Sequence, residues 1–149
     1  MSEIERHNLP HLTVAVVIEN EGRLLMVEER AADGATVFNQ PAGHVESGET
    51  LIEAALRETL EETAWEVELE AMLGIYTYST ATTCYQRVCF TATPVRQTTA
   101  PLDPAIVAAH WLSREQIQSS ALRSPLVIQA IDDFEAGERT PLSVVKTQL

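Results

Sequence analysis

The sequence has few positive charges, few aromatic side chains and no long apolar stretch. Ten lysines and arginines stand against 22 aspartates and glutamates, for a net charge of −12. This excess of negative charge disfavours nonspecific binding to nucleic-acid polymers or to anionic membranes. No apolar run approaches the ~20 residues that a membrane-spanning helix requires. Aromatic residues make up 5% of the chain, so we do not expect a binding site built as a cage of stacked rings.

Cysteine is scarce as well. Cys84 and Cys89 are the only two, and they lie five positions apart in what we predict to be one strand. Their side chains should therefore point to opposite faces of the sheet, which disfavours a disulfide between them. Two thiols without a nearby histidine cluster are also too few for a zinc site. The N-terminal segment MSEIERHNLP is polar and acidic, unlike a secretory signal. Together these features favour a cytoplasmic protein.

The length and the hydrophobic pattern predict a single α+β domain over residues 1–149. Runs rich in β-branched residues predict strands, and the first two strands should form a hairpin around Asn20-Glu21-Gly22. N-cap residues and a proline at a first turn predict the starts of helices. We expect strands over 11–19, 23–28, 67–80, 83–95 and 106–112, a turn over 40–44, a loop over 97–104, and helices that begin at or after Thr50, Ser113 and Pro125, the last ending near Gly137.

The predicted helix after Thr50 is unusually acidic. Thr50 and Glu53 fit a capping box that fixes its start. Further along, Glu58, Glu61 and Glu62 fall within an arc of about 100° of the helix surface. Residues 50–70 hold seven glutamates and one arginine, a net charge of −6 and half the imbalance of the whole chain. Like charges at these spacings repel by a few tenths of a kcal/mol each. The face is therefore either simply solvated or a site for a hard divalent cation with oxygen ligands.

The spacing of these residues follows a known pattern. Gly43, Glu49 and the run Arg57-Glu58-Thr59-Leu60-Glu61-Glu62 match G-x5-E-x7-R-E-U-x-E-E-x-G-U, where U is aliphatic. At every charged position the chain resembles the Nudix box, the signature of the Nudix hydrolase family.

Three positions depart from the box. Thr59 and Trp65 stand where the box has aliphatic residues, and Ala64 stands where it has glycine. If residue 64 adopts a left-handed helix cap, alanine there costs roughly 1 kcal/mol. Otherwise the helix extends slightly further. Either outcome concerns packing more than chemistry.

The resemblance implies a fold and a metal site. The fold would be the Nudix α/β/α sandwich, with a mixed sheet and the box helix packed against it. The box glutamates Glu58, Glu61 and Glu62 would bind Mg²⁺, for which Mn²⁺ could substitute, and the Gly43 carbonyl would be a further ligand. Arg57 would pair with Glu49, although an i,i+4 pair with Glu61 is the alternative. The implied catalytic set is Glu49, Arg57, Glu58, Glu61 and Glu62.

Outside the box, the segment FNQPAGHVESGETLIEAALRETLEET, the helix start after Trp111 and the LRSPL element at 122–126 resemble the NudJ phosphatase branch of the family. That branch implies release of inorganic phosphate from nucleoside tri- and diphosphates, and from hydroxymethylpyrimidine pyrophosphate and thiamine pyrophosphate. General Nudix enzymes instead split a nucleoside diphosphate linked to another moiety into two phosphorylated halves, and this activity remains an alternative. A second alternative is a non-catalytic Nudix domain that senses a nucleotide.

The substrate side of the site is less defined by the sequence. We expect contacts from Arg87, Gln40 and His44, with Arg87 neutralising a phosphate oxygen, although a solvated strand face would equally explain this arginine. Asp103 precedes the predicted strand 106–112 and is a candidate general base, but it is also an ordinary turn residue. The expected partner is a small phosphorylated molecule, and both a monomer and a homodimer remain open. Rings that could stack on a base are Phe38, Tyr76, Tyr78 and Tyr85.

Overall fold

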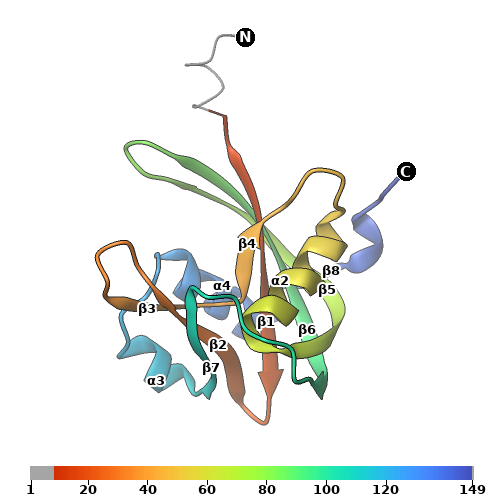
Figure 1. The fold of residues 1–149 in the computed structure, drawn as a ribbon. Helices are drawn as coiled ribbons and strands as arrows, with labels where there is room; N and C mark the ends of the chain where they lie inside the picture. The colour runs from red at the N-terminus through yellow and green to blue at the C-terminus, as the bar shows by residue number, and fades with distance from the viewer. Residues whose placement is uncertain (1–8, 149) are drawn as a thin grey trace.

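β1 is the strand that joins the two parts of the sheet. The computed structural model describes residues 9–148, which form a mixed sheet with helices on both faces (Figure 1). β1 runs parallel to β6 and antiparallel to β4, while its last residues start the antiparallel hairpin with β2. The strand order is β3-β2-β1-β6-β5-β8, with β4 also on β1 and β7 also on β2. The strands are β1 (His11–Asn20), β2 (Arg23–Arg30), β3 (Thr36–Asn39), β4 (Ala42–His44), β5 (Trp65–Ser79), β6 (Cys84–Gln97), β7 (Ile106–Leu112) and β8 (Thr140–Pro141).

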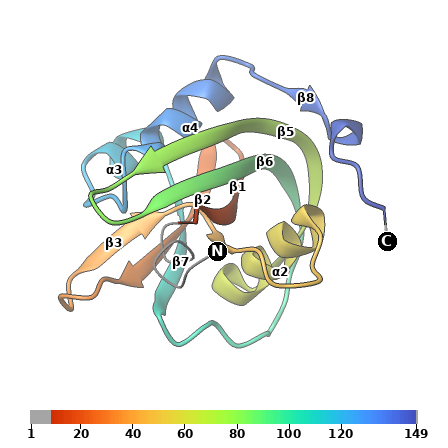
Figure 2. The same ribbon diagram turned by 90° about the horizontal axis from the view of Figure 1, so that it is seen from above.

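The helices cover opposite faces of this sheet. They are α2 (Leu51–Thr63), α3 (Arg114–Gln118) and α4 (Leu126–Glu135), followed near the C-terminus by the short 3₁₀ helix η1 (Leu142–Val144). Viewed from above, α2 lies on one side of the β1–β6 strands and α4 on the other (Figure 2). None of the helices within residues 9–148 is long and apolar enough to cross a membrane.

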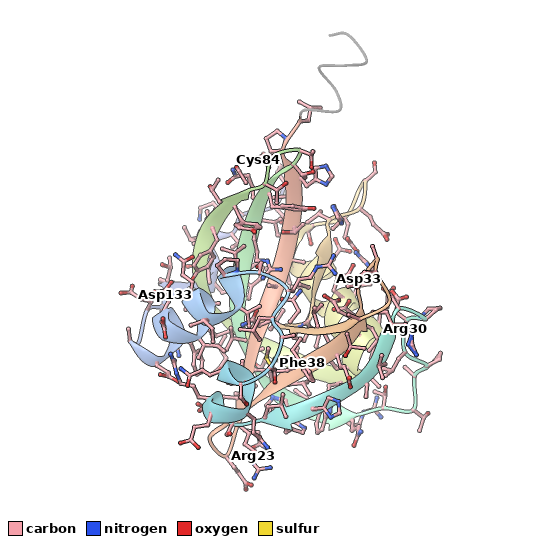
Figure 3. The ribbon with its side chains drawn as sticks, turned by 90° about the vertical axis from the view of Figure 1, so that its left-hand side faces the viewer. Arg23, Arg30, Asp33, Phe38, Cys84 and Asp133 are labelled. Atoms are coloured by element: carbon pink, nitrogen blue, oxygen red, sulfur yellow. The ribbon has the colours of Figure 1, made fainter. Side chains whose placement is uncertain are left out.

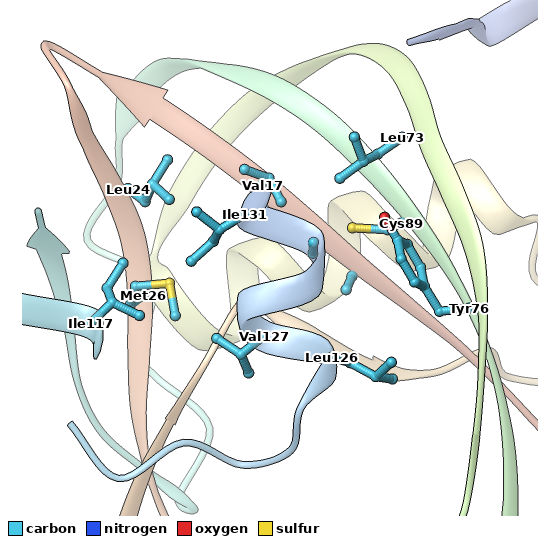
Figure 4. Packing of buried hydrophobic residues seen from close by; sticks show 12 residues of the cluster. Val17, Leu24, Met26, Leu73, Tyr76, Cys89, Ile117, Leu126, Val127 and Ile131 are labelled. Atoms are coloured by element: carbon cyan, nitrogen blue, oxygen red, sulfur yellow. The ribbon is translucent and has the colours of Figure 1, made fainter. Parts of the chain in front are cut away.

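Alternation along β1 produces two hydrophobic cores. Val14 and Val16 pack in the core under α2, whereas Ala15 and Val17 belong to the core under α3 and α4 (Figure 4). All four are at most 1% exposed. Successive side chains of a strand point to opposite faces, so a strand between two helical layers must be apolar at every position. This explains why residues 14–18 form a continuous rather than an alternating apolar run.

Local interactions fix both ends of α2. Thr50 Oγ1 accepts a hydrogen bond from Glu53 N at 3.0 Å, and Thr50 N donates to Glu53 Oε1 at 3.1 Å, which confirms the predicted capping box. The helix ends at Ala64, which adopts the left-handed conformation with φ 63° and ψ 14°. Thr59, at a box position that is usually aliphatic, is fully buried and donates its hydroxyl to Ala55 O at 2.8 Å. The buried hydroxyl is therefore satisfied within the helix.

Most of the predicted elements are confirmed, and three segments were not anticipated, the first of them β3. The β1–β2 hairpin, the long β5–β6 pair, β7 and the starts of α3 and α4 all lie where expected. The prediction of a simple turn over 40–44 was wrong for residues 42–44, which form β4 against residues 13–15 of β1. β8 and η1 follow the last helix, where we had predicted no element. Cys84 and Cys89 are free thiols, as expected.

Candidate active site

Arg57 connects the start of α2 with the loop before it. Its Nε donates to Glu49 Oε2 at 2.5 Å and its Nη2 donates to Glu49 Oε1 at 2.9 Å. Nη2 also donates to His44 O at 3.1 Å, and Nη1 donates to Glu61 Oε2 at 3.1 Å. Both the expected pair with Glu49 and the alternative pair with Glu61 are therefore present. The hydrogen bonds from Arg57 hold the pKa of the Glu49 carboxyl below its usual value.

Glu62 is the buried member of the carboxylate set. It is 7% exposed, and its Oε1 accepts a hydrogen bond from Ala42 N in β4 at 2.8 Å. Burial raises the pKa of Glu62 to about 8, and the negative charges of Glu58, Glu29 and Asp103 push it in the same direction. A buried carboxyl surrounded by three other acids is electrostatically unfavourable unless it is protonated or a cation is bound.

Gly43 and Glu58 are in unusually close contact. A Cβ atom on residue 43 would lie 2.2 Å from Glu58 Cδ and 2.3 and 2.5 Å from its two carboxylate oxygens. Only glycine leaves room for the carboxylate beside the β4 backbone. Burial raises the pKa of Glu58, although Arg57 Nη1 donates to its Oε1 at 2.8 Å and opposes that shift. The box therefore places a carboxylate directly against a backbone segment that carries carbonyl oxygens.

These residues fit a hard divalent cation. Carboxylate and carbonyl oxygens are the ligands that Mg²⁺ prefers, and a cation would neutralise the repulsion that, besides burial, raises the pKa of Glu62. Within residues 9–148, no three acidic, histidine or cysteine side chains are already arranged around a metal position. Glu58 and Glu61 are instead bonded to Arg57. Metal binding would require these two carboxylates to exchange part of that contact for the ion.

A pocket of about 370 Å³ lies on the other side of β4. Its wall includes Ala42, Gly43 and His44, so the pocket adjoins the segment that contacts Glu58 and Glu62. The remaining wall comes from β1, β2 and β3, from the β5–β6 hairpin, and from the segment before α4 together with the first residue of that helix. The polar side chains of that wall are those of Thr13, Glu29, Asn39, Thr80, Arg87, Arg123 and Ser124, with the rings of Tyr78 and Tyr85.

The three substrate residues predicted from the sequence lie in different settings. Arg87 lines the pocket, is 9% exposed, and its Nη1 has no hydrogen-bond partner among the described residues. His44 lines the pocket and its Nε2 lies 3.0 Å from His11 Nδ1. Gln40 is not part of the pocket wall: it is 1% exposed and its Nε2 donates to Val127 O in α4 at 2.9 Å. The structure therefore brings Arg87 and His44 together at the pocket and places Gln40 between the sheet and α4.

Other candidates are also separated by the structure. Asp103 donates its backbone N–H to Glu61 O at 2.8 Å, so it lies close to the carboxylate face of α2. Tyr78 and Tyr85 line the pocket. Tyr76 is buried and donates its hydroxyl to Asp133 Oδ2 at 2.6 Å. Phe38 packs against the core under α4, and Figure 3 shows it on β3 beside the segment that leads to α4.

Glu29 is a charged pocket residue that the sequence analysis missed. It lies near the end of β2, its side chain is 15% exposed, and its Oε1 is 3.6 Å from Arg123 Nη1. Burial raises its pKa, which the charge of Arg123 opposes. A glutamate in the sequence Glu28-Glu29-Arg30 resembles an ordinary solvated strand end, so its pattern gave no signal. In the folded chain it lines the pocket together with Asn39 of β3.

Comparison with known proteins identifies the family. The NUDIX domain profile matches residues 9–131. The chain belongs to the Nudix family. This Nudix protein is 41% identical over 140 residues to phosphatase NudJ from Escherichia coli (strain K12), covering 91% of the chain and 90% of that protein. The solved structure of a Nudix hydrolase from Nitrosomonas europaea superposes with a TM-score of 0.91 and 41% identity, covering 94% of this chain and 98% of the other.

A more distant relative shows the fold alone. The Nudix domain of Shewanella oneidensis NrtR, solved with ADP ribose, has a TM-score of 0.74 and 19% identity, covering 92% of this chain and 99% of that one. The expected mixed-sheet Nudix fold is therefore confirmed. The chain is a Nudix hydrolase with phosphatase NudJ among its homologues.

Proposed function

We propose that this Nudix hydrolase uses Mg²⁺ to hydrolyse a phosphoanhydride bond in a small phosphorylated molecule and releases inorganic phosphate. The substrates implied by its similarity to NudJ are nucleoside tri- and diphosphates, hydroxymethylpyrimidine pyrophosphate and thiamine pyrophosphate. The observation that carries the proposal is the placement of opposite charges on the two sides of β4. Glu58 and Glu62 contact β4 from α2, and the pocket beside β4 contains the buried guanidinium of Arg87.

Each charged residue has a distinct task in this reaction. Mg²⁺ would neutralise charge on the phosphates and lower the pKa of a water molecule. Glu58, Glu61 and Glu62 would hold the ion together with the Gly43 carbonyl, and Glu58 or Glu62 would accept the proton of the attacking water. Catalysis of phosphoryl transfer consists largely of such positioning and charge stabilisation.

Arg57 and Glu49 would act as positioning residues. The two hydrogen bonds from Arg57 to Glu49 fix α2 relative to the loop before it. The hydrogen bond from Arg57 to His44 O fixes the helix relative to β4. Arg87 would donate to a phosphate oxygen from inside the pocket, and His44 would contact the substrate at the pocket wall. We place the activity in the cytoplasm, which is consistent with the two free thiols.

Phosphate release measured with and without Mg²⁺ tests this proposal. The panel should contain nucleoside di- and triphosphates, thiamine pyrophosphate and ADP-ribose, with orthophosphate and pyrophosphate assayed separately. In the variant Glu62→Gln the side chain keeps its shape but loses its negative charge. The matched control is Glu68→Gln, which replaces an exposed glutamate on β5.

We expect wild type and Glu68→Gln to release orthophosphate only with Mg²⁺, and Glu62→Gln to be severely impaired. If wild type releases nothing from any diphosphate, the hydrolase function is wrong for these substrates. Full activity of Glu62→Gln would overturn the metal assignment while leaving the hydrolase function standing. If the wild type splits ADP-ribose into two phosphorylated halves and releases no orthophosphate from the other substrates, the protein is instead a pyrophosphohydrolase of linked nucleoside diphosphates.

A further inference from the structure

Two arginines from distant parts of the chain line the same pocket. Arg87 comes from β6, and Arg123 comes from the segment before α4. Backbone hydrogen bonds seat that segment on β3, since Phe38 N donates to Ala121 O at 2.8 Å and Arg123 N donates to Phe38 O at 2.9 Å. The position of Arg123 is therefore set by the backbone of the pocket wall, independently of its own side chain.

The cationic charge of this pair is incompletely balanced. Arg87 is buried, and its Nη1 lacks a hydrogen-bond partner among the described residues. Glu29 Oε1 lies 3.6 Å from Arg123 Nη1, and the charges of Glu29 and Glu62 both act on Arg87. Neither carboxylate accepts a hydrogen bond from Arg87 Nη1, and an unsatisfied buried charged donor is costly. The pocket therefore has an open place for a polar, anionic ligand.

The two guanidinium groups also act on each other. Burial lowers the pKa of Arg87, and the charge of Arg123 lowers it further. Burial raises the pKa of Glu29, although the charges of Arg123 and Arg87 oppose that shift. An anion between the two arginines would relieve their repulsion and satisfy the free Nη1 donor.

The position of the pair relative to the box narrows the kind of anion. Ala42 and Gly43 belong to the pocket wall on one side, and on the other they contact the carboxylates of Glu62 and Glu58. A diphosphate that lies along this wall would have one phosphate beside the Ala42–Gly43 backbone, where the Gly43 carbonyl is the proposed cation ligand. Its other phosphate would then extend into the arginine end of the pocket.

We propose that Arg87 and Arg123 form a second phosphate subsite, which selects substrates whose diphosphate ends in an unesterified phosphate. This specificity rests on the proposed hydrolase function. A terminal phosphate carries a charge of about −1.5 to −2 and has three free oxygens, whereas a phosphate esterified on both sides carries a single charge and has two. Two planar guanidinium forks have enough donors to use all three oxygens. ADP should therefore be a better substrate than ADP-ribose, whose two phosphates are both esterified.

The test compares ADP with ADP-ribose in arginine variants. The variants are Arg123→Gln, Arg87→Gln and Arg87→Lys, with Arg96→Gln as the matched control. Arg96 lies on the same strand as Arg87, but its side chain is 68% exposed and paired with Glu66. Arg123 is half exposed, so its variant should fold even if the buried Arg87 variants do not.

We expect the ratio of kcat/KM for ADP to that for ADP-ribose to fall about tenfold or more in Arg123→Gln, the effect of losing a charge-assisted hydrogen bond. The ADP to ADP-ribose ratio of kcat/KM should fall less in Arg87→Lys than in Arg87→Gln, since lysine keeps the positive charge but lacks the paired N–H donors of a guanidinium. Arg96→Gln should keep the wild-type ratio. An unchanged ratio in Arg123→Gln, or a wild type that prefers ADP-ribose, overturns the subsite.

A binding measurement separates this inference from the proposed function. Methylenediphosphonate, which cannot be hydrolysed, is titrated calorimetrically into wild type and each variant in EDTA, so that no metal contributes. We expect binding to wild type and Arg96→Gln, and about tenfold weaker binding to Arg123→Gln. Equal binding to wild type and Arg123→Gln, or none to wild type, overturns the subsite. If wild type binds the analogue through the arginines but hydrolyses nothing, the hydrolase proposal fails while the subsite stands.

Discussion

Arg57 holds both carboxylate oxygens of Glu49, at 2.5 and 2.9 Å, across the loop that leads into α2. The same guanidinium reaches Glu58 and Glu61 and the backbone of His44. One side chain thus orients two of the carboxylates proposed to bind the cation, the loop before the helix and the end of β4. Its planar fork makes this geometry possible, because a lysine ammonium cannot bond in two parallel directions.

Arg57→Lys should therefore weaken Mg²⁺-dependent activity more than it weakens the fold. We expect an increase in the Mg²⁺ concentration needed for half-maximal phosphate release, with a melting temperature lowered by a few degrees at most. The control is Arg114→Lys, which breaks a similar fork to Asp132 and Glu135 far from the pocket. Equal Mg²⁺ requirements in the two variants would show that the Arg57 fork does not organise the site.

Gly43→Ala should displace the Glu58 carboxylate, because the new Cβ would lie 2.2 Å from Glu58 Cδ. We expect activity to fall by roughly 100-fold or more if the transition state loses several kcal/mol of charge stabilisation. Circular dichroism should report a native fold. Gly34→Ala provides the contrast, since it strains a remote turn at φ +85° without steric contact. Gly34→Ala should lose stability but keep the wild-type dependence of activity on Mg²⁺. If Gly43→Ala also keeps that dependence, the contact between Gly43 and Glu58 does not position the carboxylate.

Ala64→Gly should stabilise the protein. Ala64 ends α2 with φ 63°, where a Cβ is unfavourable and glycine is the usual residue. We expect the free energy of unfolding to rise by about 0.5–1 kcal/mol, measured by chemical denaturation. Ala136→Gly is the matched control, because Ala136 ends α4 in the right-handed conformation with φ −71°. If both variants lose stability, the left-handed cap is not a source of strain.

Stability of the metal-free protein should decrease as the pH rises from about 4.5 to about 8. Burial raises the pKa of Glu62 to about 8 from an ordinary value of 4.5. The folded chain therefore keeps a proton that the unfolded chain loses in this window. The contribution of Glu62 is fully present below the unfolded pKa and is lost as the pH rises through the folded pKa.

Thermal melts in EDTA between these pH values test this expectation. The melting temperature of Glu62→Gln should depend on pH less steeply than that of wild type, because the amide does not titrate. Added Mg²⁺ should stabilise wild type more near the upper end of the window, since protons and cations compete for the carboxylate. A wild-type melting temperature that rises with pH across the window would be inconsistent with a buried, protonated Glu62.

Features encoded by neighbouring residues could be predicted from the sequence. The capping box of Thr50 and Glu53, the β1–β2 hairpin and the Arg57–Glu49 pair each depend on short spacings or on the family pattern. β4 could not be predicted in this way, because three residues including Gly43 form a strand only when β1 is already beside them. Local propensity has little influence on so short an element.

The pocket was harder to predict for the same reason. Glu29, Arg87 and Arg123 are 36 to 94 residues apart in the chain and are brought together only by the strand order and by the seating of residues 121–123 on β3. Gln40 shows the converse case. It is a polar residue beside the box glycine, yet its amide donates to Val127 O and connects the sheet with α4. A sequence pattern identifies such a residue but not the direction of its side chain.

The backbone seating of Arg123 on β3 has an evolutionary consequence. Because Phe38 hydrogen-bonds to the main chain of residues 121 and 123, the wall should keep its shape with any side chain at residue 123 except proline, which lacks the N–H donor. Relatives could therefore exchange this residue freely and acquire new substrates without rebuilding the fold. Swapping residue 123 alone would be an economical first step for redirecting this scaffold toward a differently charged leaving group.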